Sequence, residues 1–224
     1  MLSRKKLLEA LDKGESLTIE FKQRFTTFEK MAKEMIAFAN TRGGYIFLGV
    51  DDDKSIFGIE SEKSDLELVK EAAEKYCEPA VNYQLQCIQV ERKDVLVIEI
   101  LESSVKPNRI QDYQKELNLN TAQVYVRVND KSILASKEMI KLLQTQSANK
   151  SLVNYVVGNQ EKIVFNYLDN NETISVKELS KCANISERRA SRTLIKLVRA
   201  NLLLIHQKDN GESYFTYAGD SEKL

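Results

Sequence analysis

Five basic side chains lie close together between residues 186 and 199, where the sequence reads SERRASRTLIKLVR. Glu187 is the only acidic residue of this stretch. Clustered cationic side chains bind phosphate, and the planar guanidinium of arginine can also pair with guanine through two hydrogen bonds. The residue types therefore indicate nucleic-acid binding, although the chain as a whole holds 33 basic and 33 acidic residues and carries no net charge. The basic residues are Arg188, Arg189, Arg192, Lys196 and Arg199.

The element that must carry these cations is an amphipathic helix, predicted over residues 187–201. Its apolar positions, among them Ala190 and Leu194, recur at the spacing of one helical face, so the basic side chains are expected on the other face. Two shorter helices are predicted before it, over 160–168 and 176–182, and a β-hairpin after it, formed by LLLIHQ and ESYFTY around the turn KDNG. This order of elements is typical of a winged helix-turn-helix domain.

In helix-turn-helix proteins the second helix of the motif lies in the major groove, with its first turns against the bases. We therefore predict that the chain binds duplex DNA through this helix, and that the hairpin turn contacts the backbone or the minor groove. RNA is a further candidate partner. The alternative is a solvated basic face in a domain that binds protein, and we favour DNA. The predicted nucleic-acid-binding residues are Ser186, Arg188, Arg189, Arg192, Lys196 and Lys208, and Ser191 is expected at the same end of the helix.

A second group of charged residues lies near the N-terminus. LTIEFK (17–22) alternates apolar and polar residues, which predicts a strand with Glu20 and Lys22 on the same face. The run YIFLGV (45–50) is apolar throughout, as in a strand that is covered on both faces, and Asp51 follows it directly. If the two strands are neighbours, charged side chains from several segments converge. These side chains are Glu15, Glu20, Lys22, Asp51 and Arg127.

Convergent carboxylates bind Mg²⁺ or Mn²⁺ through their oxygens, and such a metal can activate water to cleave a phosphodiester. The candidate catalytic residues are Glu15, Glu20, Lys22 and Asp51, of which the three carboxylates would hold the metal. The alternative is an ion pair of Glu20 with Lys22 or with Arg127 that only pins the sheet. We favour the ion pair, because structural ion-pair networks commonly imitate catalytic sites, and we expect no cofactor unless the chain is a nuclease.

The order of the predicted elements mixes local hairpins with helical crossovers, which indicates an α+β fold with a mixed sheet. We predict a mixed-sheet α/β domain over 1–145, a linker over 146–158 and a winged-helix domain over 159–224. No apolar run approaches the length of a membrane span, and the charged N-terminus lacks the apolar stretch of a signal peptide. The three cysteines are widely spaced and suggest no disulfide framework, so we expect a cytoplasmic protein.

Three separated motifs stand in order along the chain: Glu20-Phe21-Lys22, then Phe38-Ala39-Asn40-Thr41 with Gly43-Gly44 and Gly49-Val50-Asp51, then Val126-Arg127-Val128. They resemble the Schlafen/AlbA-type domain family, which has also been labelled a divergent AAA or DNA-binding domain. The resemblance covers roughly residues 10–145. In this family the domain often precedes a C-terminal winged helix in bacterial transcription regulators. The resemblance therefore implies a DNA-binding regulator. We expect a homodimer or higher homo-oligomer, with the N-terminal domain supplying dimerisation and binding of nucleic acid or an effector.

The resemblance also implies an enzymatic alternative. In eukaryotic Schlafen nucleases carboxylates in this pattern form a ribonuclease site, and Glu15, Glu20 and Asp51 match that pattern. Those nucleases use two lobes around their RNA, whereas this chain has one lobe and would need to dimerise. ATP hydrolysis is not expected, because the chain has no GxxxxGKS/T motif and its paired glycines precede a strand rather than a helix. We favour the regulator over the enzyme.

Overall fold

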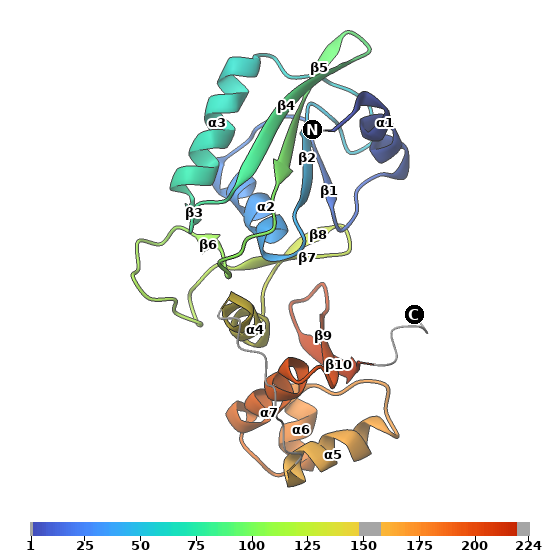
Figure 1. Cartoon of the computed structure of the whole chain (residues 1–224), viewed down its shortest axis with the longest axis vertical. Coiled ribbons are helices and arrows are strands. Elements are labelled where there is room, and N and C mark those ends of the chain that lie inside the picture. The colour runs from blue at the N-terminus through green and yellow to red at the C-terminus, as the bar shows by residue number, and fades with distance from the viewer. Residues whose placement is uncertain (1, 148–157, 219–224) are drawn as a thin grey trace. The chain divides into compact units, whose positions relative to one another are not determined.

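The computed structural model describes residues 2–147 and 158–218, and the chain divides into two compact units, Met1–Leu134 and Ala135–Leu224 (Figure 1). Both units contain helices and strands, so the α+β composition predicted from the sequence is confirmed. Within the described ranges no helix is both long and apolar enough to cross a membrane.

A four-stranded mixed sheet forms the centre of the first unit. Its elements are β1 (Ile19–Lys22), β2 (Gly44–Leu48), β4 (Tyr83–Val90) and β5 (Lys93–Ile100), with the helices α1 (Arg4–Lys13), α2 (Phe28–Asn40) and α3 (Glu62–Lys75). The strand order is β1-β2-β5-β4, where β1 runs parallel to β2 and the other neighbours are antiparallel. β2 is apolar because both of its faces are covered, as predicted. Ile46 and Leu48 pack with α2 and α3, whereas Phe47 packs with α1 (Figure 1).

Two short antiparallel ribbons complete the first unit. They pair β7 (Tyr125–Val128) with β8 (Lys131–Leu134) and β3 (Cys77–Glu78) with β6 (Arg109–Ile110). The sequence predicts a strand over 123–128 but gives no alternating pattern for its partner β8. The sequence also predicts a short strand over 55–59. This prediction is wrong, because only Ile56 pairs there, in an isolated bridge with Val50.

The second unit contains four helices and a hairpin within the residues that the structure describes. These elements are α4 (Lys137–Ser147), α5 (Asn159–Leu168), α6 (Val176–Cys182), α7 (Glu187–Arg199), β9 (Leu203–Gln207) and β10 (Ser213–Tyr217). β9 and β10 are antiparallel, and Ile174, before α6, exchanges two backbone hydrogen bonds with Phe215 of β10, at 3.0 and 2.8 Å. Leu179 of α6 and Leu194 of α7 pack with Phe215, so α5, α6, α7 and the hairpin share one core.

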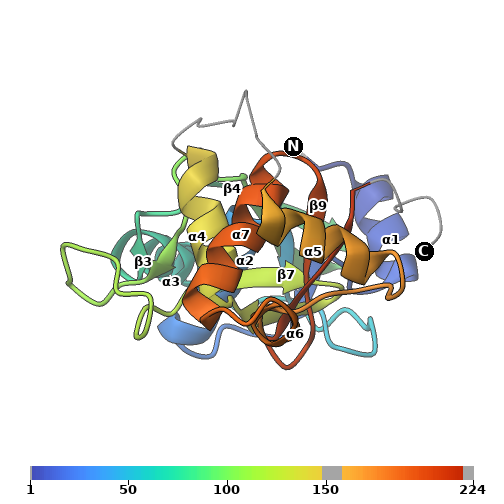
Figure 2. The ribbon, with the colours of Figure 1, turned by 90° about the horizontal axis from the view of Figure 1, so that it is seen from below.

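Helix α4 belongs to the second unit, whereas the predicted first domain extends to residue 145. The reason is its polar contact with α7, beside which it lies in Figure 2. Ser191 of α7 donates from Oγ to Glu138 Oε1 at 2.7 Å and accepts from Lys141 Nζ at 3.2 Å. Most of the linker predicted over 146–158 lies outside the described residues.

Candidate nucleic-acid interface

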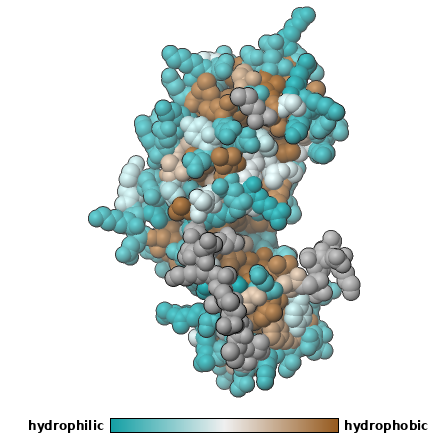
Figure 3. All heavy atoms as spheres, in the orientation of Figure 1, coloured by the Kyte–Doolittle hydropathy of each residue, from teal (hydrophilic) through white to brown (hydrophobic). Residues whose placement is uncertain are grey.

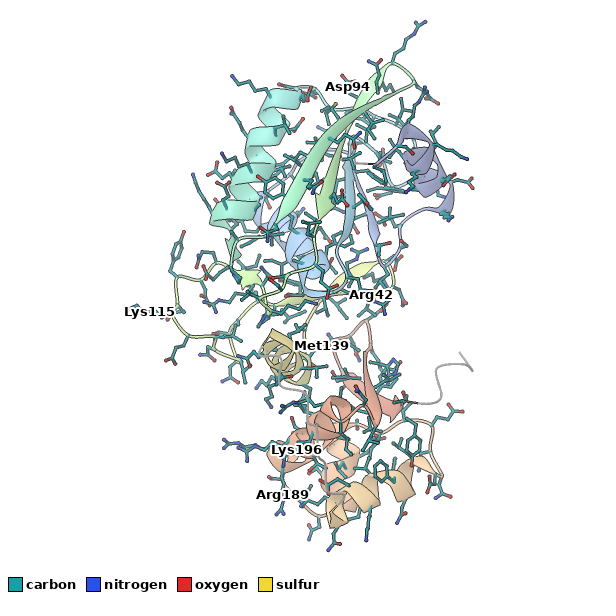
Figure 4. All side chains as sticks on the ribbon, viewed as in Figure 1. Arg42, Asp94, Lys115, Met139, Arg189 and Lys196 are labelled. Atoms are coloured by element: carbon teal, nitrogen blue, oxygen red, sulfur yellow. The ribbon has the colours of Figure 1, made fainter. Side chains whose placement is uncertain are left out.

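Helix α7 presents cations along one face and packs with the other. Arg188, Arg192 and Lys196 follow one another at intervals of four residues, so they lie on the same side of the helix. All three are exposed, and their side chains form no ion pair within residues 2–147 and 158–218. Ala190 and Leu194, on the opposite face, are buried. Hydrophilic side chains form the left margin of this unit in Figure 3, where Figure 1 draws α7, and Lys196 extends away from the helix in Figure 4.

Arg189 is also exposed, but α5 holds its side chain. The amide of Gln160, oriented with its oxygen toward Arg189, accepts from Nε at 2.6 Å and from Nη2 at 2.8 Å. The amide nitrogen of Gln160 donates to Thr193 Oγ1 at 3.1 Å. Between α5 and α7 lies an open hollow of about 500 Å³, lined by all four exposed cations and by Gln160, Ser186 and Thr193, with Glu161 also on its wall.

The other residues predicted to contact nucleic acid take different positions. Ser186 caps α7, because its hydroxyl accepts from the Arg189 backbone N–H at 3.4 Å, and it also lines the hollow. Lys208 is exposed on the turn between β9 and β10. Ser191 is buried and bonded to α4, so it does not share the exposed face. Arg199 is only partly exposed, which leaves four exposed cations on α7 rather than five.

In the first unit, Arg127 of β7 is the centre of a buried charge network. Its Nη1 lies 2.7 Å from Oε2 of Glu20 and 3.3 Å from Oε2 of Glu34, and its Nη2 donates to the Ser16 carbonyl at 2.8 Å. Glu20 also bonds to Lys22. Arg127 is 4% exposed, Glu20 6% and Glu34 8%, so these charges are removed from water. Both ion pairs of Glu20 that the sequence suggested are therefore present.

Glu34 of α2 is the member of this network that sequence reasoning missed. Ser132 of β8 donates to its Oε2. Burial raises the pKa of Glu34 above its usual value, and the charge of Glu20 raises it further. A sequence signal did exist, because Glu34 stands between Met31 and Met35 on the apolar face of its helix, where a carboxylate needs a partner.

Glu15 and Asp51 are engaged in other hydrogen bonds. Glu15 accepts from the Phe21 backbone N–H at 2.9 Å, and Asp51 Oδ2 accepts from Gln23 Nε2 at 2.7 Å. Burial raises the pKa of Glu15, and the nearby Glu20 charge adds to that rise. Among the described residues, no three histidine, cysteine, aspartate or glutamate side chains are grouped so that they could hold a metal ion. Glu15, Glu20 and Asp51 therefore do not assemble the candidate metal site here.

The polar residues at the end of α2 connect this helix to distant segments of the first unit. The Asn40 side chain donates to the carbonyls of Asn108 at 2.8 Å and Tyr125 at 2.9 Å, and it accepts from the Asn108 N–H at 2.7 Å. Thr41 Oγ1 accepts from the Arg127 backbone N–H at 2.9 Å. This part of the motif read from the sequence thus fixes the position of β7, which carries Arg127.

Comparison with known proteins gives one family match and several more distant likenesses. The family described as Schlafen, AlbA_2 matches residues 15–136, close to the end of the first unit at Leu134. A relative from Ureaplasma parvum serovar 3, named an uncharacterized ATP-binding protein, is 30% identical over 42% of this chain and 32% of its own length. The chain thus spans about a third of that relative.

Two solved structures show weaker likeness. The N-terminal domain of a protein from Nitrosomonas europaea, described as related to the ATP-dependent DNA helicase RecG, is 27% identical with a TM-score of 0.42, and the match covers 52% of this chain and 84% of that one. The DIP2311 protein from Corynebacterium diphtheriae is 14% identical with a TM-score of 0.45, covering 97% of this chain and 35% of that one.

Proposed function

Because the chain belongs to the Schlafen AlbA_2 family, we propose that it is a DNA-binding member of it, whose second unit is a winged helix-turn-helix with α7 as the recognition helix. The order α5, α6, α7 and hairpin supports this proposal, as does the bridge that joins Ile174 to the hairpin. In such domains the recognition helix enters the major groove, and the hairpin contacts the backbone or the minor groove.

One observation carries the proposal. Arg188, Arg192 and Lys196 are exposed on the face of α7 opposite its buried side, and they have no ionic partner among the described residues. Holding unneutralised charges together costs free energy through their mutual repulsion, and an anionic ligand removes this cost. Duplex DNA supplies such a ligand, with bases in a groove wide enough for a helix. The residues assigned to DNA contact are Ser186, Arg188, Arg189, Arg192, Lys196 and Lys208.

The proposal extends to transcription regulation by a homodimer. A single winged helix makes few phosphate contacts, whereas two copies joined by their first units would engage two half-sites of one duplex and bind more tightly without new contacts. The first unit would also supply the binding of a further nucleic-acid segment or an effector.

Replacing two cations of α7 tests DNA binding. With Arg188→Ala plus Arg192→Ala, the affinity for duplex DNA should fall roughly thirty-fold or more, because each arginine contact to a base contributes about 1 kcal/mol or more. The dependence of the logarithm of the binding constant on the logarithm of salt should become shallower for each phosphate contact that is lost. Fluorescence anisotropy of a labelled duplex at two salt concentrations measures both quantities.

The matched control removes two exposed cations from the first unit, as Arg4→Ala plus Lys30→Ala. This variant should bind DNA like the native chain. An equal loss of DNA affinity in both double variants would mean that DNA binds to exposed cations anywhere on the protein. An unchanged affinity in the α7 variant would refute the assignment of α7 as the recognition helix.

A metal-dependent nuclease is not proposed for this chain. Both oxygens of Glu20 serve ion pairs, one with Lys22 and one with Arg127, and Asp51 accepts a hydrogen bond from Gln23. Repeating the assay on RNA and single-stranded DNA with Mn²⁺ tests this choice directly. Cleavage that Glu20→Gln abolishes would restore the enzymatic alternative.

A further inference from the structure

We propose that the hollow between α5 and α7 binds one phosphate of the DNA backbone, and that Gln160 is the positioning residue that fixes Arg189 there. The inference rests on the proposed function and adds two things to it. The hollow is assigned a phosphate as its ligand. Gln160, a neutral residue of α5, is given a part in DNA binding that the basic residues of α7 alone do not indicate.

Gln160 occupies only part of the hydrogen-bonding capacity of the Arg189 guanidinium. A guanidinium has five N–H groups in a planar fork. The Gln160 oxygen receives two of them, one from Nε at 2.6 Å and one from Nη2 at 2.8 Å. The remaining donors include one on each terminal nitrogen at the outer end of the group. Such a pair binds phosphate through two parallel hydrogen bonds. Arg189 is therefore held by one edge and open at the edge that suits a phosphate.

Gln160 is itself fixed. Its amide nitrogen donates to Thr193 Oγ1 at 3.1 Å, and the hydroxyl of Thr193, a residue only 5% exposed, donates to the Arg189 carbonyl at 3.2 Å. Together these hydrogen bonds form a closed ring that joins Gln160 of α5 to Arg189 and Thr193 of α7. An arginine held in this way loses less side-chain freedom when its ligand arrives, so more of the interaction is retained as affinity.

The charge around the hollow suits an anion. Arg188, Arg192 and Lys196 line it together with Arg189, and Glu161 is the acidic residue on its wall. The Glu161 carboxylate accepts from the Gly158 backbone N–H at 3.0 Å, so part of its charge is engaged at the start of α5. The side chains that line the hollow therefore carry four positive charges and one negative charge.

The test compares Gln160→Ala with Asn166→Ala, which removes an exposed amide from the other end of α5. Gln160→Ala should weaken binding to any duplex sequence about three- to tenfold, the cost of ordering one freed arginine, without changing the salt dependence. Arg189→Ala should weaken binding and also lower the salt dependence by about one phosphate contact. The variant with both changes should bind no more weakly than Arg189→Ala, and Asn166→Ala should bind like the native chain.

Arg189→Lys keeps the charge and leaves the bond between Gln160 and Thr193 intact, but lysine cannot form the paired hydrogen bonds. It should bind as weakly as Gln160→Ala, and it decides the question if Gln160→Ala fails to fold by circular dichroism. Native affinity in Arg189→Lys, or additive losses in the doubly changed variant, would overturn the inference while DNA binding through Arg188 and Arg192 still stands. If the native chain binds no duplex at low salt, the proposed function itself fails.

Discussion

A buried arginine keeps its positive charge, because its guanidinium stays protonated over the whole pH range in which proteins remain folded. Arg127 is buried, and the structure surrounds its guanidinium with Glu20, Glu34, Ser132 and a backbone carbonyl. The guanidinium also lies 4.6 Å from the centre of the Phe38 ring, within the range of a cation–π contact. Arg127 therefore stabilises the folded first unit only while these partners compensate the loss of its hydration.

Replacing Arg127 with alanine should therefore destabilise the first unit by about 3–5 kcal/mol, because Glu34 loses its buried cation and Glu20 keeps only its ion pair with Lys22. Arg4→Ala, at an exposed position on α1, should change stability by less than about 0.5 kcal/mol. The chain has no tryptophan, so urea unfolding is followed by circular dichroism. Equal stability of the two variants would show that the buried ion pairs contribute nothing.

Glu34 gives the network a pH dependence. Its pKa is raised in the folded protein, first by burial and then by the Glu20 charge, so the folded state binds a proton more readily than the unfolded chain does. The free energy of unfolding should therefore fall as pH rises above about 4.5, the pKa of an unperturbed glutamate, because Glu34 ionises more readily in the unfolded chain. Glu34→Gln should lack this loss, and its stability relative to the native chain should rise with pH in that window. Parallel stability curves from urea unfolding at several pH values would contradict the assignment.

The sequence predicted part of this residue-scale organisation. The alternation in 17–22 placed Glu20 and Lys22 on one face, and pairing of Glu20 with Lys22 or Arg127 followed from charge alone. Asp51 was expected to join them because it follows β2. A strand pattern does not determine which way the chain turns after its last residue, and Asp51 bonds to Gln23 instead.

At the scale of elements, the turn between α2 and β2 depends on Gly43. Its φ of 70° is in the left-handed region, and a Cβ there would lie 2.6 Å from the Ile100 carbonyl oxygen. A backbone atom inside a sheet cannot move away cheaply, so both the strain and the clash remain.

Gly43→Ala should therefore cost about 2 kcal/mol or more of stability. The control is Gly158→Ala, where φ is −93° and the nearest atom is the end of the flexible Glu161 side chain. This change should cost at most about 1 kcal/mol, from the weaker helix cap. Urea unfolding measures both, and a harmless Gly43→Ala would mean that the turn can adopt another conformation.

Segments with a clear apolar pattern were predictable from sequence, and segments without one were not. Helix α7 and strand β2 have strong apolar patterns, and the structure places both where the patterns indicate. β8 has four residues and no alternation, so only its partner β7 makes it a strand. The sequence also predicts a helix over 137–143, where α4 lies, but the attachment of α4 to α7 depends on contacts of Ser191 that a sequence taken one segment at a time does not reveal.

At the scale of the whole molecule, the absence of net charge has a practical meaning for DNA binding. The 33 basic and 33 acidic residues cancel, so long-range attraction to DNA is weak, and binding depends on the local concentration of cations on α7. A single copy then makes few contacts with DNA, so a second, linked copy on the same duplex would raise the overall affinity.

We expect two chains, each of 25.6 kDa, on one duplex, with half-sites separated by about one helical turn, roughly 34 Å, or a multiple of it. Sedimentation analysis of the complex measures this stoichiometry. Dilution below the dimer dissociation constant should weaken DNA binding, and Arg188→Ala plus Arg192→Ala should leave the dimer intact. A complex with one chain per duplex at every concentration would rule out the dimeric regulator.

The charge network around Arg127 also constrains which substitutions this chain can accept as it diverges. Its members lie on β1, α2, β7 and β8, far apart along the chain, and the loss of the arginine alone leaves buried carboxylates unbalanced. Substitutions at these positions should therefore be inherited as a set: in a descendant where the arginine has become apolar, the glutamates equivalent to Glu20 and Glu34 should have become neutral as well.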